Sequence, residues 1–155
     1  MQILVCRKDL LGDLLQDNAP FFAQWGFVSK SNPAVVLTAI EFEQRNDRYR
    51  AYGYLFGYPE HAIEFFVNAS IDYQKTDTFV KRSFFNIPVF AGVKGHFTYA
   101  LPENVTPSVK DSLLFKKASK ILNEYKAIRP KYVNGKGALK SVKLLRDWWG
   151  KTTKK

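Results

Sequence analysis

Two adjacent segments with alternating side chains dominate the middle of the sequence. Residues 34–44, AVVLTAIEFEQ, are rich in β-branched side chains, and residues 49–58, YRAYGYLFGY, alternate aromatic with small or charged side chains. The polar stretch between them, RNDR, is typical of a turn. Because a period of two is the signature of half-buried strands, the two segments predict a β-hairpin.

Charge supports one particular register for this hairpin. If residues 44–47 form the loop, Glu43 lies opposite Arg48 and Glu41 lies opposite Arg50. Each opposite-charge pair would stabilise the hairpin by about 0.2–1 kcal/mol. The sequence therefore predicts that the two strands pair in this register.

The opposite face of the second strand contains Gly53 and Gly57. Without a Cβ atom, these glycines would let another element approach the backbone closely. Pro59 is a residue that the first turn of a helix accepts, and apolar side chains follow it at helical spacing. We therefore expect a helix after Pro59 to pack against Gly53 and Gly57.

The rest of the chain predicts a mixed α+β fold. Apolar spacing predicts helices over residues 3–16, 108–128 and 138–149, and alternation predicts strands over 79–90 and 96–101. Ser108 and Asp111 predict a capping box. The expected architecture is a small antiparallel sheet of about four strands, in two hairpins. An N-terminal helix, a helix between the hairpins and two basic C-terminal helices would pack on it.

Length and composition predict a single α+β domain over residues 1–150, followed by a flexible basic tail over 151–155. Cys6 is the only cysteine, which excludes an internal disulfide and a cysteine-based zinc cluster. The N-terminus lacks the pattern of a signal peptide, and no apolar run has the length of a membrane span. We therefore expect a soluble, cytoplasmic protein.

The positive charge is concentrated near the C-terminus. Residues 1–103 contain ten Lys and Arg against eleven Asp and Glu, whereas residues 104–155 contain fourteen against three. This asymmetry indicates either an anionic partner such as nucleic acid or simply a solvated surface. The candidate anion-binding side chains are those of Lys136, Lys140, Lys143 and Arg146.

The aromatic face of the first hairpin is a candidate binding site for a small molecule or a protein. Aromatic side chains with polar groups at their rim can form an apolar pocket, although the same pattern also describes ordinary core. The candidate residues are Tyr52, Tyr54, Phe56, Glu41, Arg48 and Arg50.

The two histidines suggest a third site. His61 and Glu64 share a helical face, and His96 from a later strand would complete a set of two histidines and a carboxylate. Such spacing arises easily by chance, so we expect neither a metal nor a cofactor. No motif for nucleophilic catalysis occurs.

These patterns favour a binding or interaction module over an enzyme. The predicted function is binding of a small ligand or a protein at the aromatic sheet face. The alternatives are nucleic-acid binding by the basic C-terminal helices and metal-assisted hydrolysis at His61, Glu64 and His96.

Overall fold

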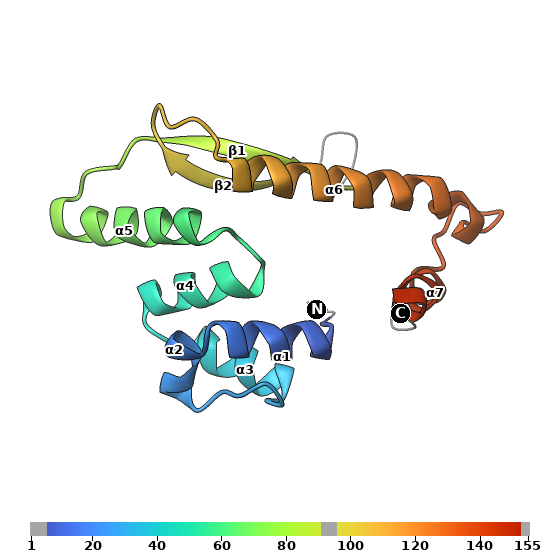
Figure 1. Cartoon of the computed structure of the whole chain (residues 1–155), viewed down its shortest axis with the longest axis horizontal. Helices are drawn as coiled ribbons and strands as arrows, with labels where there is room; N and C mark the ends of the chain where they lie inside the picture. Colours follow the sequence, from blue (N-terminus) through green and yellow to red (C-terminus); the bar gives the residue numbers. More distant parts are fainter. Residues whose placement is uncertain (1–5, 91–95, 153–155) are drawn as a thin grey trace. The chain divides into compact units, whose positions relative to one another are not determined.

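The structure is a computed structural model that describes residues 6–90 and 96–152, with side chains as far as residue 150. Within these residues the fold is α+β but mostly helical, with seven α-helices and a single two-stranded antiparallel hairpin (Figure 1). The elements in chain order are α1 (Lys8–Asp17), α2 (Ala19–Phe22), α3 (Pro33–Glu41), α4 (Arg45–Leu55), α5 (Glu60–Thr76), β1 (Arg82–Pro88), β2 (His96–Pro102), α6 (Val109–Ile128) and α7 (Ser141–Thr152).

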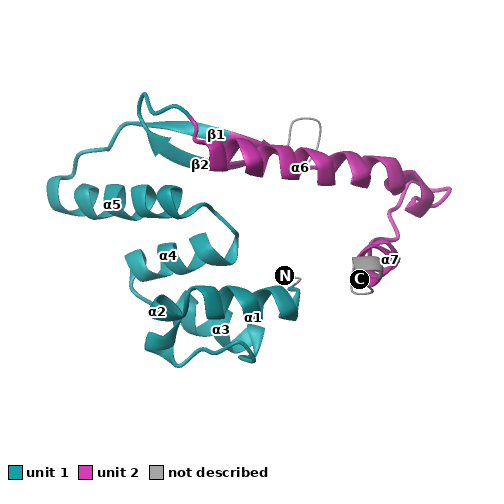
Figure 2. Ribbon diagram, in the orientation of Figure 1, with its two compact units in different colours: residues 1–85, 99–106 teal, residues 86–98, 107–155 magenta. Residues whose placement is uncertain are grey.

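The chain divides into two compact units, which Figure 2 shows in different colours. Unit 1 comprises residues 1–85 and 99–106, and unit 2 comprises residues 86–98 and 107–155. The β1–β2 hairpin contributes residues to both units. A single domain over residues 1–150 stays a prediction. Of the predicted tail, residues 153–155 lie outside the described residues, whereas 151 and 152 belong to α7.

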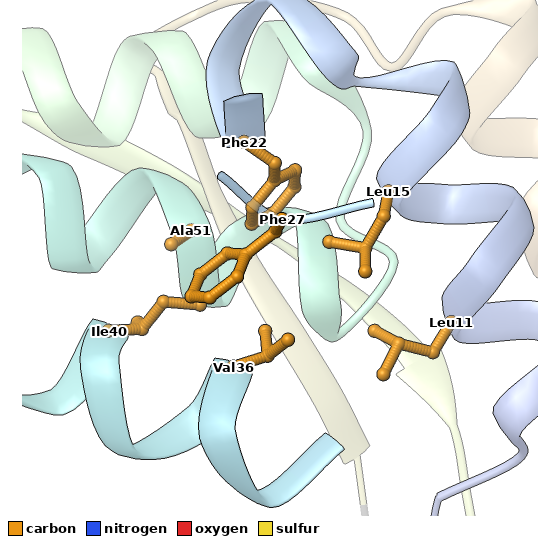
Figure 3. Close-up of a cluster of buried hydrophobic side chains, with 7 residues drawn as sticks. All are labelled: Leu11, Leu15, Phe22, Phe27, Val36, Ile40 and Ala51. Atoms are coloured by element: carbon orange, nitrogen blue, oxygen red, sulfur yellow. The ribbon is translucent and has the colours of Figure 1, made fainter. Parts of the chain in front are cut away.

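The core of unit 1 is formed by side chains from its first four helices and the loop before α3. Helix α1 begins at Lys8 rather than near residue 3, and residues 1–5 lie outside the described residues. The buried cluster in Figure 3 consists of Leu11, Leu15, Phe22, Phe27, Val36, Ile40 and Ala51. Leu11 and Leu15 of α1 are four residues apart, which places them on one face of the helix toward this cluster, whereas Leu10 is exposed.

The predicted hairpin over residues 34–58 is wrong, because both segments are helical. The Asn32 side chain accepts a hydrogen bond from the Ala34 amide at 2.9 Å, and Pro33 occupies the first turn of α3. These are strong helix-start signals. Val36 and Ile40 are fully buried, whereas Val35 is 57% exposed. Burial therefore follows the i, i+4 spacing of a helix, and the β-branched composition does not decide the structure.

The predicted charge pairs are also wrong, because the RNDR stretch is the first turn of α4 and not a hairpin loop. Arg48 does not pair with the Glu43 side chain as part of a ladder. Instead, its guanidinium donates a hydrogen bond to the backbone carbonyl of Glu41 at 3.1 Å. The Glu41 carboxylate accepts a hydrogen bond from the Tyr52 hydroxyl. The polar contacts thus connect the end of α3 to α4.

The close approach at Gly53 is confirmed, although it joins two helices and not a strand to a helix. A Cβ atom at Gly53 would lie 2.7 Å from Cγ1 of Ile63 on α5. The expectation for Gly57 is wrong, since a Cβ atom there would meet nothing within 4 Å. Gly57 has a φ of 72° and ends α4. The Tyr58 amide donates to the Gly53 carbonyl and the Gly57 amide donates to the Tyr54 carbonyl, which is the Schellman pattern.

The second predicted hairpin is confirmed. Strand β1 ends at Pro88, which lacks the amide needed to continue a ladder. Thr98 donates a side-chain hydrogen bond to Asn86 at 2.7 Å, and Ser83 donates one to the Pro102 carbonyl at 3.2 Å. The predicted turn AGVKG, residues 91–95, lies outside the described residues.

Helix α6 begins and ends as its sequence predicts, whereas α7 begins at Ser141 and not near residue 138, and it continues past Gly150 to Thr152. Ser108 and Asp111 form the expected capping box, in which each side chain accepts a hydrogen bond from the other residue's amide. A short 3-10 helix over Arg129–Tyr132 follows α6. The NGKG segment then turns with Gly137 at a φ of 77°, and an antiparallel bridge joins Val133 to Leu139 just before α7.

Candidate functional site

The predicted ligand-site residues lie on and beside α4, where their polar groups contact one another or Glu60. Tyr54 packs against the core cluster of unit 1, and its hydroxyl donates to the Glu60 carboxylate at 2.8 Å. Arg50 lies 4.0 Å from the same carboxylate. Tyr52 stacks on Phe56 with ring centroids 5.6 Å apart. These contacts connect α4 to its neighbours, and ligand binding at these residues stays a prediction.

The surroundings of α4 raise the pKa values of two of its tyrosines, Tyr52 and Tyr54. Burial raises the pKa of Tyr54, and its hydrogen bond to Glu60 raises it further. The pKa of Tyr52 is raised mainly by its hydrogen bond to Glu41. In both cases the neutral phenol is favoured, because the anion would lose a donated hydrogen bond and face a carboxylate.

The three residues of the predicted metal site belong to different surroundings. The ring of His61 meets the edge of Tyr99 in unit 1, with centroids 6.3 Å apart. Glu64 is exposed on α5, and His96 is an exposed residue of unit 2. Among the residues that the structure describes, no three His, Cys, Asp or Glu side chains form a group able to hold a metal ion.

The positive charge of the chain belongs to unit 2. Its residues, 86–98 and 107–155, include fifteen Lys and Arg against three Asp and Glu, whereas unit 1 has nine against eleven. None of the Lys or Arg side chains described in unit 2 forms a salt bridge; the ion pairs found join residues of unit 1. Among the described residues, the basic side chains of unit 2 are therefore not paired with its carboxylates.

Three of the four predicted anion-binding residues lie together at the start of α7, with Lys140 just before its first residue. Lys140, Lys143 and Arg146 border a surface hollow of about 450 Å³, together with Ser141, Val142 and Asp147. The Asp147 carboxylate accepts a hydrogen bond from the Tyr132 hydroxyl at 2.9 Å, which raises the pKa of Tyr132. Lys136 lies in the preceding turn, where its amide donates to the side chain of Asn134.

A second feature of unit 2 was not predicted from the sequence. The segment at the end of β1, one face of α6 and the side chain of Trp148 enclose an apolar groove of about 350 Å³. We call it the aromatic groove, and it is lined by Pro88, Val89, Phe90, Ala118, Ile121, Leu122, Tyr125 and Trp148. Of these side chains, Phe90 remains 47% exposed and Ile121 remains 48% exposed. Apolar surface in the groove is therefore open to a ligand.

Aromatic contacts organise the groove. Tyr125 stacks on Trp148 with centroids 5.8 Å apart and an interplanar angle of 16°. Phe90 meets Tyr125 edge to face at 4.9 Å. The Arg129 guanidinium lies over the Phe90 ring, 5.0 Å from its centroid. The Arg129 Nε atom is buried and has no hydrogen-bond partner among the described residues, so the ring rather than an acceptor holds that part of the side chain.

Lysines flank this groove along α6. At 100° per residue, Ala118, Leu122, Tyr125 and Arg129 share one face of the helix. Lys117 and Lys126 project to opposite sides of that face, and both are exposed. Apolar and cationic surfaces therefore alternate around α6. The sequence did contain a signal for this face of α6, because Tyr125 and Arg129 are four residues apart. It did not indicate that Phe90, at the end of β1, packs against the same face.

No helix of the described residues is both long and apolar enough to cross a membrane. The comparisons with known proteins assign no family: no family model, no curated protein and no solved structure matches this chain.

Proposed function

We propose that the chain is a nucleic-acid-binding protein and that unit 2 binds the polymer chiefly through phosphate neutralisation. The observation that carries this proposal is the segregation of charge, fifteen basic against three acidic residues on unit 2. A basic surface that served only solubility would not have to be confined to one compact unit. Concentration of Lys and Arg on one face or unit is the electrostatic footprint of nucleic-acid binding.

The composition of the basic surface indicates how it would bind. Thirteen of the fifteen basic residues are Lys, which acts as a point charge and does not form the planar fork that reads guanine edges. Phosphate contacts fix position on the polymer but carry no direct sequence information. The expected binding is therefore insensitive to sequence and weakens steeply with salt.

Binding of a small ligand or a protein near Tyr52 and Tyr54 is the weaker candidate. The sheet face that motivated it is replaced by helix α4, and the hydroxyl groups of both tyrosines are bonded to carboxylates of the same unit. Metal-assisted hydrolysis has no observation in its favour.

The test compares two charge-reversed variants with the native chain. In the first variant, Lys140, Lys143 and Arg146 are replaced by Glu; in the matched control, Lys30, Arg45 and Lys75 of unit 1 are replaced by Glu. All six side chains belong to the described residues, and each variant changes the net charge equally. Affinity for labelled duplex and single-stranded DNA of mixed sequence is measured over a range of salt concentrations, with circular dichroism as the check of folding.

We expect the first variant, changed at Lys140, Lys143 and Arg146, to lose most of the binding. The unit 1 control should retain more of it. The log–log dependence of affinity on salt should become shallower by about 0.9 for each duplex phosphate that the variant no longer neutralises, and by about 0.7 for each phosphate of a single strand. Equal weakening in both folded variants would mean that only net charge matters. Absence of binding to either polymer at low salt would reject the proposed function.

A further inference from the structure

We infer that the aromatic groove of unit 2 takes an unstacked base, so that the chain prefers single-stranded nucleic acid over duplex. This inference rests on the proposed function, because the phosphate contacts of unit 2 would bring the polymer to the groove. It adds a specific ligand chemistry, namely a flat aromatic base with a phosphate on either side.

The walls of the groove suit a flat apolar ligand. Phe90, Tyr125 and Trp148 bring three aromatic rings to its lining, and aliphatic side chains of α6 complete it. Its volume of about 350 Å³ lies near the lower end of the range of ligand pockets, roughly 300–1,000 Å³. Bases stack on aromatic side chains regardless of their sequence, since every base has a π-face.

The charges around the groove complement a nucleotide better than a neutral apolar ligand. Arg129 lies over the Phe90 ring, and it forms no salt bridge among the described residues. Lys117 and Lys126 are exposed on either side of the groove-facing surface of α6. A base in the groove would therefore have a cation near each of its flanking phosphates, which is the combination that single-strand binding proteins use.

A duplex cannot use the groove in the same way. Its bases are stacked and paired, so a base must be unstacked and turned out before an aromatic side chain can take its π-face. A single strand exposes its bases without that cost. The phosphate contacts are common to both polymers. The difference between the affinity for the single strand and the affinity for the duplex therefore measures the contribution of the groove.

The experiment measures the affinity of the full chain for a labelled oligothymidylate and for a DNA hairpin of equal phosphate number, by fluorescence anisotropy at several salt concentrations. The test variant is Phe90→Leu, which removes a ring but keeps an apolar side chain at a position 47% exposed. The matched control is Phe84→Leu, at a position on β1 that is 63% exposed and does not line the groove.

We expect the native chain to bind the oligothymidylate more tightly than the hairpin. Phe90→Leu should weaken single-strand binding by about fivefold or more, which matches the removal of one base–aromatic stacking interaction. Because every phosphate contact is kept, its salt dependence and its affinity for the hairpin should stay unchanged. Phe84→Leu should behave like the native chain in every measurement.

Each other outcome has a defined meaning. Equal affinity for both polymers, or an unchanged affinity of folded Phe90→Leu, overturns the role of the groove and leaves the proposed function standing. No binding to either polymer at low salt overturns both. Phosphatidylserine vesicles form a third arm: an effect of Phe90→Leu confined to vesicles would assign the groove to a lipid surface and reject the base.

Discussion

Gly53 lies on the face of α4 that packs against α5, and Ile63 occupies the space into which a side chain at Gly53 would extend. The distance of 2.7 Å from a Cβ atom at Gly53 to Ile63 Cγ1 is shorter than real contacts of this kind. We expect Gly53→Leu to lower the free energy of unfolding of unit 1 by about 1–3 kcal/mol through overpacking. Chemical denaturation followed by circular dichroism measures this decrease.

A double-mutant cycle separates overpacking from other causes of that decrease. Replacing Ile63 with Ala removes the side-chain atoms nearest to Gly53. If overpacking is the cause, Gly53→Leu should cost less in the Ile63→Ala background than in the native chain, because residues in contact are energetically coupled. A cost that is the same in both backgrounds would show that Ile63 is not the obstacle.

The surroundings of Tyr54 predict how the stability of unit 1 changes at alkaline pH. Its pKa is raised above the ordinary value of 10.0 by burial and by the hydrogen bond to Glu60. A group whose pKa is higher in the folded than in the unfolded state contributes its full stability below the unfolded pKa and loses it as pH rises. The stability that Tyr54 contributes should therefore decline above a pH of about 10.

The measurement for Tyr54 is the free energy of unfolding between neutral pH and the alkaline limit of the fold, for the native chain and for Tyr54→Phe. The variant keeps the ring but has no hydroxyl to ionise. We expect the native chain to lose stability faster than the variant once the pH exceeds that ordinary pKa. Parallel curves for the two proteins would contradict a raised pKa at this residue.

At the level of elements, helices with clear start signals could be predicted from the sequence. Helices rich in β-branched and aromatic residues were wrongly predicted to be strands. The capping box at Ser108 and Asp111 and the turn at Pro59 were sufficient to place α6 and α5. Residues 34–58 were misassigned because β-branched and aromatic side chains also pack well on helices when every fourth one is buried. Asn32 followed by Pro33, and Gly57 followed two residues later by Pro59, were local signals that favoured helices there.

The candidate site in unit 2 could be predicted only in part, for a similar reason. Its charge is a property of composition, so the sequence alone located the basic residues. Its groove joins Phe90, Tyr125 and Trp148, which are far apart in the chain and meet only through tertiary packing. Local periodicity carries no information about such contacts, and so the aromatic groove required the fold.

The capping box gives the prediction at this scale. Ser108→Ala removes the acceptor for the Asp111 amide at the start of α6. Such a change costs about 0.5–2 kcal/mol of helix stability. We expect lower helical content and a lower melting temperature, both seen by circular dichroism. Ser112→Ala, an exposed substitution within the same helix, is the matched control and should be neutral or slightly stabilising. Equal decreases in the two variants would contradict a capping role.

For the whole molecule, the two units differ in how much apolar surface they bury. Among the described residues, the buried hydrophobic side chains of unit 2 are Ile87 and Leu144, whereas fourteen buried hydrophobic residues belong to unit 1. Buried apolar contacts are the main source of local stability, and segments with few of them open most readily. Unit 2 also concentrates like charges, which repel one another in a compact state. The small number of buried apolar side chains and the charge repulsion both lower the stability of unit 2.

We therefore expect backbone amides of α6 and α7 to exchange with deuterium faster than those of α4 and α5 in the free protein. Hydrogen exchange followed by mass spectrometry measures both units in the same sample, so unit 1 serves as the internal control.

A bound polyanion stabilises the folded state of the unit that it contacts and screens the repulsion between the like charges of that unit. Saturating oligothymidylate should accordingly slow exchange in α6 and α7 and leave α4 and α5 unchanged. Equally slow exchange of all four helices in the free chain would contradict the difference in stability. Protection by the oligonucleotide confined to unit 1 would place the binding surface on the wrong unit.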